Sequence, residues 1–213
     1  MNDCPFCNLD KQTKAILPLN IIDRYEVNIL HSGKYLRIIP DIAPVIPFHI
    51  LIVPNEHVFS MQTLSDYAKM ELSVLKEKVS SFYKAINGKP ALFFEHGSCN
   101  GDGNSACIIH AHLHCLPYSK RAYEQFYNRS NSSLTALISK QKHENYLQFE
   151  YCERTYYWED NTEKKQFFRQ LVSETEGNQR GIWQICLYSS ESADNKAWVS
   201  ECVYRWNNYF NKD

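Results

Sequence analysis

The stretch His110–Pro117 reads HAHLHCLP and places a histidine at every second position from 110 to 114. In a β-strand, alternate side chains lie on one face of the sheet, roughly 6.6 Å apart. His110, His112 and His114 are therefore expected to form a row of imidazoles, while the residues between them face a core. Clustered imidazoles at neutral pH suit metal binding, nucleophilic attack or acid–base chemistry. Chance placement is a poor explanation, because the whole chain has only 8 histidines.

Strand and helix patterns surround this stretch in the first half of the chain. Runs of β-branched and aromatic residues bounded by turn residues predict strands at Tyr25–Leu30, Lys34–Ile39, His49–Val53, Ala91–Glu95 and Cys107–Leu116. The first two are expected to flank a turn at 31–33, and the nearly apolar third is expected to be central.

A long helix is predicted between the third and fourth of these strands. Thr63 and Asp66 resemble a capping box at its start, and Gly88 with Pro90 ends it. Apolar residues recur between these limits at helical spacing, at Leu75, Val79, Phe82 and Ile86. The order of elements predicts an α+β domain with an antiparallel sheet, which we assign to residues 1–118.

The second half is more polar and aromatic. We predict one helix at Ala122–Lys140, or two broken at 128–131, then paired strands at Tyr146–Tyr151 and Arg154–Trp158, and helices at Glu163–Glu174 and Asn195–Phe210. The apolar content is too thin for a separate core of this length. Residues 119–213 are therefore expected to form a mixed helix and strand extension packed on the first domain.

Charge and hydropathy exclude several classes of function. Lys and Arg number 23 against 24 Asp and Glu, so the net charge of -1 argues against a nucleic-acid partner bound through bulk electrostatics. No run of apolar residues is long enough for a membrane span, so no membrane partner is expected. Met1–Pro5 lacks a basic region followed by an apolar run. We therefore expect a cytoplasmic protein whose cysteines are reduced.

A second motif, Cys4-Pro5-Phe6-Cys7, brings two sulfurs close together. Such a CxxC turn serves zinc binding or a redox disulfide, and an incidental pair is a third interpretation. A redox role would require the motif at the start of a helix that follows a strand. Zinc would require two more ligands, for which His57 and the histidine row supply imidazoles.

Together these motifs resemble the histidine triad superfamily, whose signature is His-φ-His-φ-His-φ-φ with φ hydrophobic. Residues 110–116 match it completely, and Asp41–His57, reading DIAPVIPFHILIVPNEH, is similar to the family's upstream D-I-x-P and H-x-L-V-I-P-x-x-H pattern. The resemblance covers about residues 4–118 and implies a HIT-like antiparallel sheet with a long helix. Phe94–Gly97 resembles the corresponding segment of a family branch that has a C-terminal extension. In the second half of this chain, Gln166–Leu171 shows a fainter likeness to that branch.

The resemblance implies nucleotide chemistry. The family attacks the α-phosphate of a bound nucleotide with its middle histidine, here His112, and water or another acceptor resolves the nucleotidyl-histidine. An imidazole is both a good nucleophile and a good leaving group, so one difficult displacement becomes two easier ones. His114 would stabilise charge on the phosphate oxygens. His49 would orient the triad or take a direct catalytic part, and Asp41 would contact the ribose hydroxyls or serve only as a turn residue.

The zinc-bearing branch of the family implies a structural zinc cofactor. Its four ligands correspond here to Cys4, Cys7, His57 and His110. A Cys₂His₂ set closes a tetrahedral site and leaves no position for substrate.

Two positions depart from the family pattern. A hydroxyl residue that contacts phosphate is replaced by Cys107, for which Ser105 could substitute as a nucleotide contact. An asparagine is replaced by Glu95-His96. We predict that His96 contacts phosphate or protonates the leaving group, and that Glu95 serves a cationic leaving group.

We therefore predict a nucleotidyl hydrolase that acts on a dinucleoside polyphosphate or phosphoramidate. His114 favours hydrolysis, because the family's transferases typically carry glutamine there. Three alternatives stay open: transfer to a non-water acceptor, a zinc-stabilised nucleotide-binding module without turnover, and a purely structural zinc protein. A nucleotide is the expected partner, and whether the chain forms a homodimer stays open.

Overall fold

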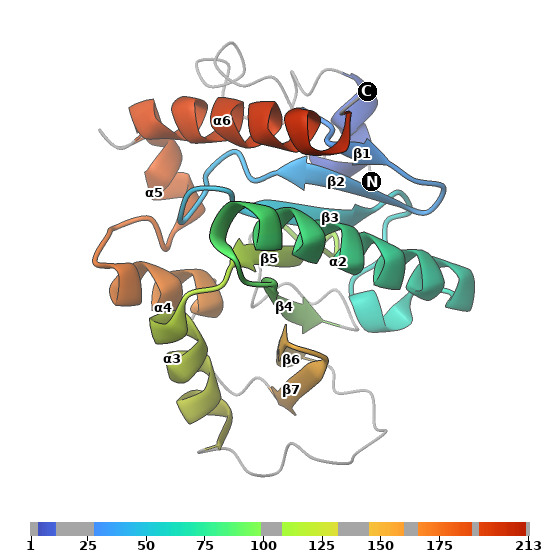
Figure 1. Ribbon diagram of the computed structural model, residues 1–213. Helices are drawn as coiled ribbons and strands as arrows, with labels where there is room; N and C mark the ends of the chain where they lie inside the picture. Colours follow the sequence, from blue (N-terminus) through green and yellow to red (C-terminus); the bar gives the residue numbers. More distant parts are fainter. Residues whose placement is uncertain are drawn as a thin grey trace.

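A computed structural model describes residues 4–11, 28–98, 108–131, 145–159, 166–188 and 192–211 of the 213-residue chain (Figure 1). Over these residues one antiparallel sheet has the strand order β1-β2-β3-β5-β4-β6-β7. The α+β class predicted from the sequence is confirmed. The strands are β1 His31–Ser32, β2 Leu36–Pro40, β3 Ile50–Pro54, β4 Ala91–Ser98, β5 Leu113–Pro117, β6 Asn145–Tyr151 and β7 Arg154–Glu159.

The predicted long helix is α2, Asp66–Asn87. Its N-cap is Ser65, whose side chain accepts a hydrogen bond from the amide of Ala68, so the predicted capping role of Thr63 is wrong. The helix ends at Gly88, whose φ of 74° is accessible to glycine at little cost. The other described helices are η1 Phe6–Lys11, η2 Met61–Thr63, α3 Lys120–Asn131, α4 Phe167–Glu176, α5 Trp183–Tyr188 and α6 Ser192–Phe210.

Two predicted strands need correction. The first strand, β1, lies at His31–Ser32, where a turn was expected, and the turn follows it, closed by the amide of Gly33 donating to the Leu36 carbonyl at 2.8 Å. Residues 25–27 and 107 lie outside the described part of the chain. The predicted strand at Cys107–Leu116 is wrong over residues 108–112, because β5 begins only at Leu113.

The two faces of the sheet bury different cores. One face packs against α2 and α6, which lie across the front of the sheet and above it in Figure 1. The opposite face is covered by η1 at one end and by α3 and α4 at the other. The second face carries His49 and His114, because His114 stacks on Phe94, a member of the α3–α4 core.

The C-terminal extension continues the sheet. Strand β6 pairs with β4 from Asn145 opposite Ser98 to Glu150 opposite Phe93, and β7 pairs with β6 as the sequence predicted. Gly97 on β4 leaves room for the ring of Tyr146, which a side chain there would strike. Lys76 on α2 forms an ion pair with Glu150, which fastens the long helix to the extension.

Helices expected in the second half are present with changed limits. The helix expected at Ala122–Lys140 is α3, Lys120–Asn131, and residues 132–144 lie outside the description. The helices expected at Glu163–Glu174 and Asn195–Phe210 correspond to α4 and α6. Among the described helices, none combines the length and apolar character needed to cross a membrane. The division into domains after residue 118 stays a prediction.

Candidate functional site

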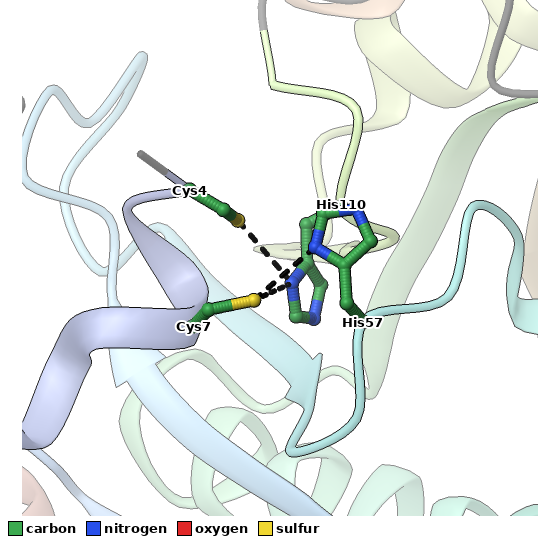
Figure 2. Close-up of side chains that lie close together, drawn as sticks. All are labelled: Cys4, Cys7, His57 and His110. Carbon is green, nitrogen blue, oxygen red and sulfur yellow. Dashed lines mark hydrogen bonds between the residues drawn. The ribbon is translucent and has the colours of Figure 1, made fainter. Parts of the chain in front are cut away.

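Four side chains from three separated segments lie close together (Figure 2). Cys4 and Cys7 come from the N-terminal segment, His57 from the loop after β3, and His110 from the segment before β5. Their ligand atoms all lie within 4.8 Å of one another. This cluster could bind a metal ion.

The donor set fits a tetrahedral metal site. Cys7 Sγ lies 3.2 Å from His57 Nδ1 and 3.4 Å from His110 Nδ1, and Cys4 Sγ lies 3.5 Å from His110 Nδ1. Sulfur and nitrogen ligands of one zinc ion are separated by roughly 3.5 Å, given zinc–ligand bonds of about 2.3 and 2.0 Å at tetrahedral angles. The match in both distance and ligand type supports a metal here.

A hydrogen bond from the ring nitrogen that faces away from the sulfurs orients His110. Its Nε2–H donates to the carbonyl oxygen of Pro54 at 2.9 Å, which leaves the Nδ1 lone pair facing the two sulfurs. Burial lowers the pKa of His110 to about 4, so the imidazole is neutral, as a metal ligand must be.

His112 is held in a different way. Its Nδ1–H donates to the carbonyl oxygen of His110 at 2.9 Å, so Nε2 carries the lone pair. Burial lowers the pKa of His112, which keeps the ring neutral near pH 7. The side chain is only half-buried, whereas His110 and His114 are buried, and Phe6 of η1 packs against its ring at 5.3 Å. A neutral, reachable imidazole nitrogen can act as a nucleophile.

His114 and His49 form a buried pair beside His112. His49 Nε2 lies 2.9 Å from His114 Nδ1, and the rings of His112 and His114 are 4.8 Å apart. His114 also stacks on Phe94 at 4.5 Å. Burial lowers the pKa of both His49 and His114 well below 6.5, so both are neutral.

Asp41 anchors this pair from the other side. Its Oδ1 accepts from the Ala43 amide at 2.8 Å, and its Oδ2 lies 3.3 Å from His49 Nδ1. Arg169 of α4 donates to the same Oδ2 at 2.6 Å. Asp41 is 7% exposed and Arg169 is 4% exposed, so the ion pair is buried.

The structure describes two of the four predicted nucleotide contacts, Asp41 and His96. Asp41 is at the site, but it is bonded to Arg169. His96 lies on β4 two residues from Phe94, so it faces the same side of the sheet as the ring that stacks on His114. Ser105 and Cys107 lie outside the described residues.

The leaving-group role expected for Glu95 is wrong. Its neighbour Phe94 stacks on His114, and adjacent strand residues face opposite ways, so Glu95 faces away from the triad. Its oxygens accept from the Met61 amide at 2.8 Å and from the Tyr146 hydroxyl at 2.6 Å.

Two residues at the site, both within Gln166–Leu171, had no predicted role there. Arg169 and Phe168 lie on α4, and Phe168 packs on Phe94 at 5.0 Å, behind His114. The available signal was an arginine inside an apolar helical stretch that includes Leu171 and Val172. That pattern indicates a buried cation, which generally needs an acidic partner.

Three solved structures illustrate the similarity to known proteins. A HIT family hydrolase from Clostridium thermocellum is 20% identical, with a TM-score of 0.40, over 56% of this chain and 94% of its own. A zinc-bound histidine triad protein from Mycobacterium smegmatis is 14% identical, with a TM-score of 0.41, over 55% and 76%. A hypothetical histidine triad nucleotide-binding protein from Sulfolobus tokodaii is 13% identical, with a TM-score of 0.42, over 98% and 97%. At these scores the similarity carries no functional inference.

The family assignment rests on a longer sequence match. Residues 1–130 match the family described as "Protein similar to CwfJ C-terminal", which is more than half of the 213 residues. The match includes Cys4 and Cys7 of the Cys/His cluster and the whole of the histidine row. The chain therefore belongs to the family of proteins similar to the CwfJ C-terminal region.

Proposed function

We propose that this protein is a nucleotidyl hydrolase that attacks the α-phosphate of a nucleoside phosphate derivative through His112. The observation that carries the proposal is the 2.9 Å hydrogen bond from His112 Nδ1 to the His110 carbonyl. Because that bond holds the proton on Nδ1, it leaves a lone pair on Nε2 of a neutral, half-buried ring.

The reaction has two displacements. In the first, the lone pair of His112 Nε2 forms a bond to phosphorus, and the bond from phosphorus to the leaving group breaks with its electrons on that group. In the second, the oxygen of a water molecule attacks phosphorus, the phosphorus–nitrogen bond breaks, and His112 regains its lone pair. The proton that the water loses passes to solvent, which replaces the proton that the leaving group took up in the first step. His114 would donate to a phosphate oxygen as charge develops there.

The nucleotide would lie against residues around this pair of histidines. Asp41, His96, Ser105 and Cys107 stay our proposed nucleotide contacts, and His49 is the proposed support of His114. The 2.9 Å contact between the two rings supports that role for His49.

We also propose a structural zinc ion at Cys4, Cys7, His57 and His110. All four tetrahedral positions would be filled by protein, so the ion would cross-link the N-terminus to the triad segment and take no part in the reaction. The contact of Phe6, between the two cysteines, with His112 supports such a bracing role.

A substrate panel tests the proposed activity. The full-length protein is incubated with dinucleoside polyphosphates, nucleoside phosphoramidates and nucleotide sugars, in parallel with His112→Asn. We expect wild type to release a nucleoside monophosphate, and the variant to bind nucleotide in calorimetry but to lose turnover by several orders of magnitude. Tight binding without turnover in wild type would overturn hydrolysis in favour of a binding module. Turnover that requires an added acceptor would identify a transferase.

A further inference from the structure

We propose that Arg169 of the C-terminal extension is a positioning residue that determines which ring nitrogen of His114 carries the proton. It acts on His114 through Asp41 and His49. The inference deepens the proposed function and rests on it only for its kinetic test, because the position of a proton is measured without any substrate.

Several hydrogen bonds hold the side chain of Arg169 at the site. Besides the bond from Nη1 to Asp41, its Nη2 donates to the Ala43 carbonyl at 2.6 Å and its Nε donates to the Gly181 carbonyl at 3.4 Å. These bonds fix the planar guanidinium in one orientation against the carboxylate. Removal of one partner of such a buried ion pair strongly destabilises the folded protein, because the other charge is left without compensation.

Two groups compete for Nδ1 of His49. The amide of Val45 donates toward this nitrogen at 3.3 Å and requires its lone pair, whereas Asp41 Oδ2, also at 3.3 Å, would require a proton on it. A carboxylate oxygen that already accepts a short bond from a guanidinium attracts a second proton weakly. Arg169 therefore decides the competition in favour of the amide, and His49 carries its proton on Nε2.

The position of the proton on His49 determines the position of the proton on His114. With its proton on Nε2, His49 donates to Nδ1 of His114 across 2.9 Å, and the neutral ring of His114 must then carry its own proton on Nε2. Without Arg169, the Asp41 charge would draw a proton to His49 Nδ1. His49 Nε2 would become an acceptor, the proton of His114 would move to Nδ1, and His114 Nε2 would carry a lone pair that cannot donate to a phosphate oxygen.

The rings have little room to respond in another way. His114 stacks on Phe94 with an interplanar angle of 16°, and Phe94 is backed by Phe168, the neighbour of Arg169 on α4. Rotation of the ring would break this stack. Loss of Arg169 is therefore expected to move protons rather than side chains, so that α4 controls both the plane and the tautomer of His114.

Arg180 offers a matched control in the same extension. It is also buried, at 2% exposed, donates through Nε to the Pro44 carbonyl at 2.8 Å, and packs on Trp198 at 4.4 Å. Arg180→Met removes a buried guanidinium, as Arg169→Met does, without removing the hydrogen bond to Asp41 Oδ2. A purely structural role of Arg169 predicts the same behaviour in both variants.

The test is ¹⁵N NMR of histidine-labelled full-length protein near neutral pH. We expect His114 to be protonated on Nε2 in wild type and in Arg180→Met, and on Nδ1 in Arg169→Met. The double variant Arg169→Met with Asp41→Asn should return the proton to Nε2, because the uncompensated charge is gone. Protonation of His114 on Nδ1 in wild type overturns the proposal even if no variant folds, and so does an unchanged tautomer in folded Arg169→Met.

Steady-state kinetics provide a second test of the proposal. We expect Arg169→Met to lower kcat of the folded fraction by about 10²- to 10³-fold, the usual effect of losing one oxyanion donor, with KM changed by less than about threefold. Arg180→Met should keep kcat within about threefold. Equal losses in both variants would contradict the positioning role. If wild type turns over no substrate, the proposed function fails, while the NMR result still decides the tautomer.

Discussion

The three histidines of the row lie two residues apart along the chain, yet their surroundings separate them into three roles. His110 faces two sulfurs, His112 is half-buried and hydrogen-bonded through Nδ1, and His114 is stacked on Phe94 and hydrogen-bonded to His49. The predicted alternation holds, because Ala111 and Leu113 pack in the core beside α2 whereas Phe6 contacts the rings of both His110 and His112.

Substitutions along the row should separate these roles. We expect His114→Ala to lower kcat by about 10²- to 10³-fold, because one charge-stabilising donor is lost. His110→Ala should act mainly through metal content and melting temperature, with a smaller effect on kcat per folded molecule. Steady-state kinetics, calorimetry and metal analysis of both variants check this ordering. An intact kcat in His114→Ala would contradict the donor role.

Arg169 shows the limit of prediction at this scale. Its place on an apolar helical face indicates burial, but its partner Asp41 is 128 positions away in sequence. Local periodicity identifies which side chains are buried and contains no information about which distant element they meet. The motif histidines could be predicted because their spacing is local, whereas a contact between two halves of the chain could not.

At the scale of elements, β4, β6 and η2 share a buried polar network centred on Glu95. Tyr146 on β6 links it to Ser60, whose hydroxyl lies 2.6 Å from that of Tyr146. Burial raises the pKa of Glu95 from 4.5 to about 7, although the hydrogen bonds from Met61 and Tyr146 oppose the rise.

This network makes stability depend on pH in a defined direction. Glu95 binds its proton more tightly in the folded state, so its contribution is complete below pH 4.5 and is lost as pH rises through about 7. The lost contribution is roughly 3 kcal/mol. Chemical denaturation across this range should show that Glu95→Gln removes that part of the pH dependence, while the exposed control Glu174→Gln keeps it. Parallel pH curves for wild type and Glu95→Gln would refute the assignment.

The cluster of Cys4, Cys7, His57 and His110 joins elements that lie far apart in sequence. Purified protein should contain about one zinc ion per chain, and Cys4→Ser should lower both zinc content and melting temperature, since a structural metal contributes directly to folding. The natural comparison is Cys152→Ser, because Cys152 is an exposed free thiol outside the cluster. Metal-free protein of unchanged stability would argue against the site.

At the scale of the whole molecule, the extension supplies two strands of the sheet and part of the support behind the triad. The α+β class and most element positions could be predicted, because hydrophobic periodicity is a local property. The pairing of β6 with β4 could not, because strand partners are chosen by the assembled sheet. The start of α2 also differs from the prediction. Thr63 and Ser65 both have hydroxyl side chains that can cap a helix, and Ser65 is the N-cap in the structure.

Truncation tests how far the two halves depend on each other. Removal of residues 119–213 would uncover the edge of β4 and the apolar core around Phe94, and would remove Arg169 from Asp41. We expect the fragment to aggregate or to bind a hydrophobic dye, because exposed edges and apolar patches promote association. A soluble 1–118 fragment with an unchanged substrate profile would show that the extension has a separate task.

The central claim is that His112 forms a covalent bond to phosphorus. The most direct measurement is to stop the wild-type reaction in its first turnovers and to locate the adduct by intact mass and peptide mapping. The account predicts an added nucleotidyl group on His112, acid-labile and base-stable as a phosphorus–nitrogen bond should be, and no such adduct in His112→Asn. An adduct on another residue, or turnover without any adduct together with full activity of His112→Asn, would contradict it.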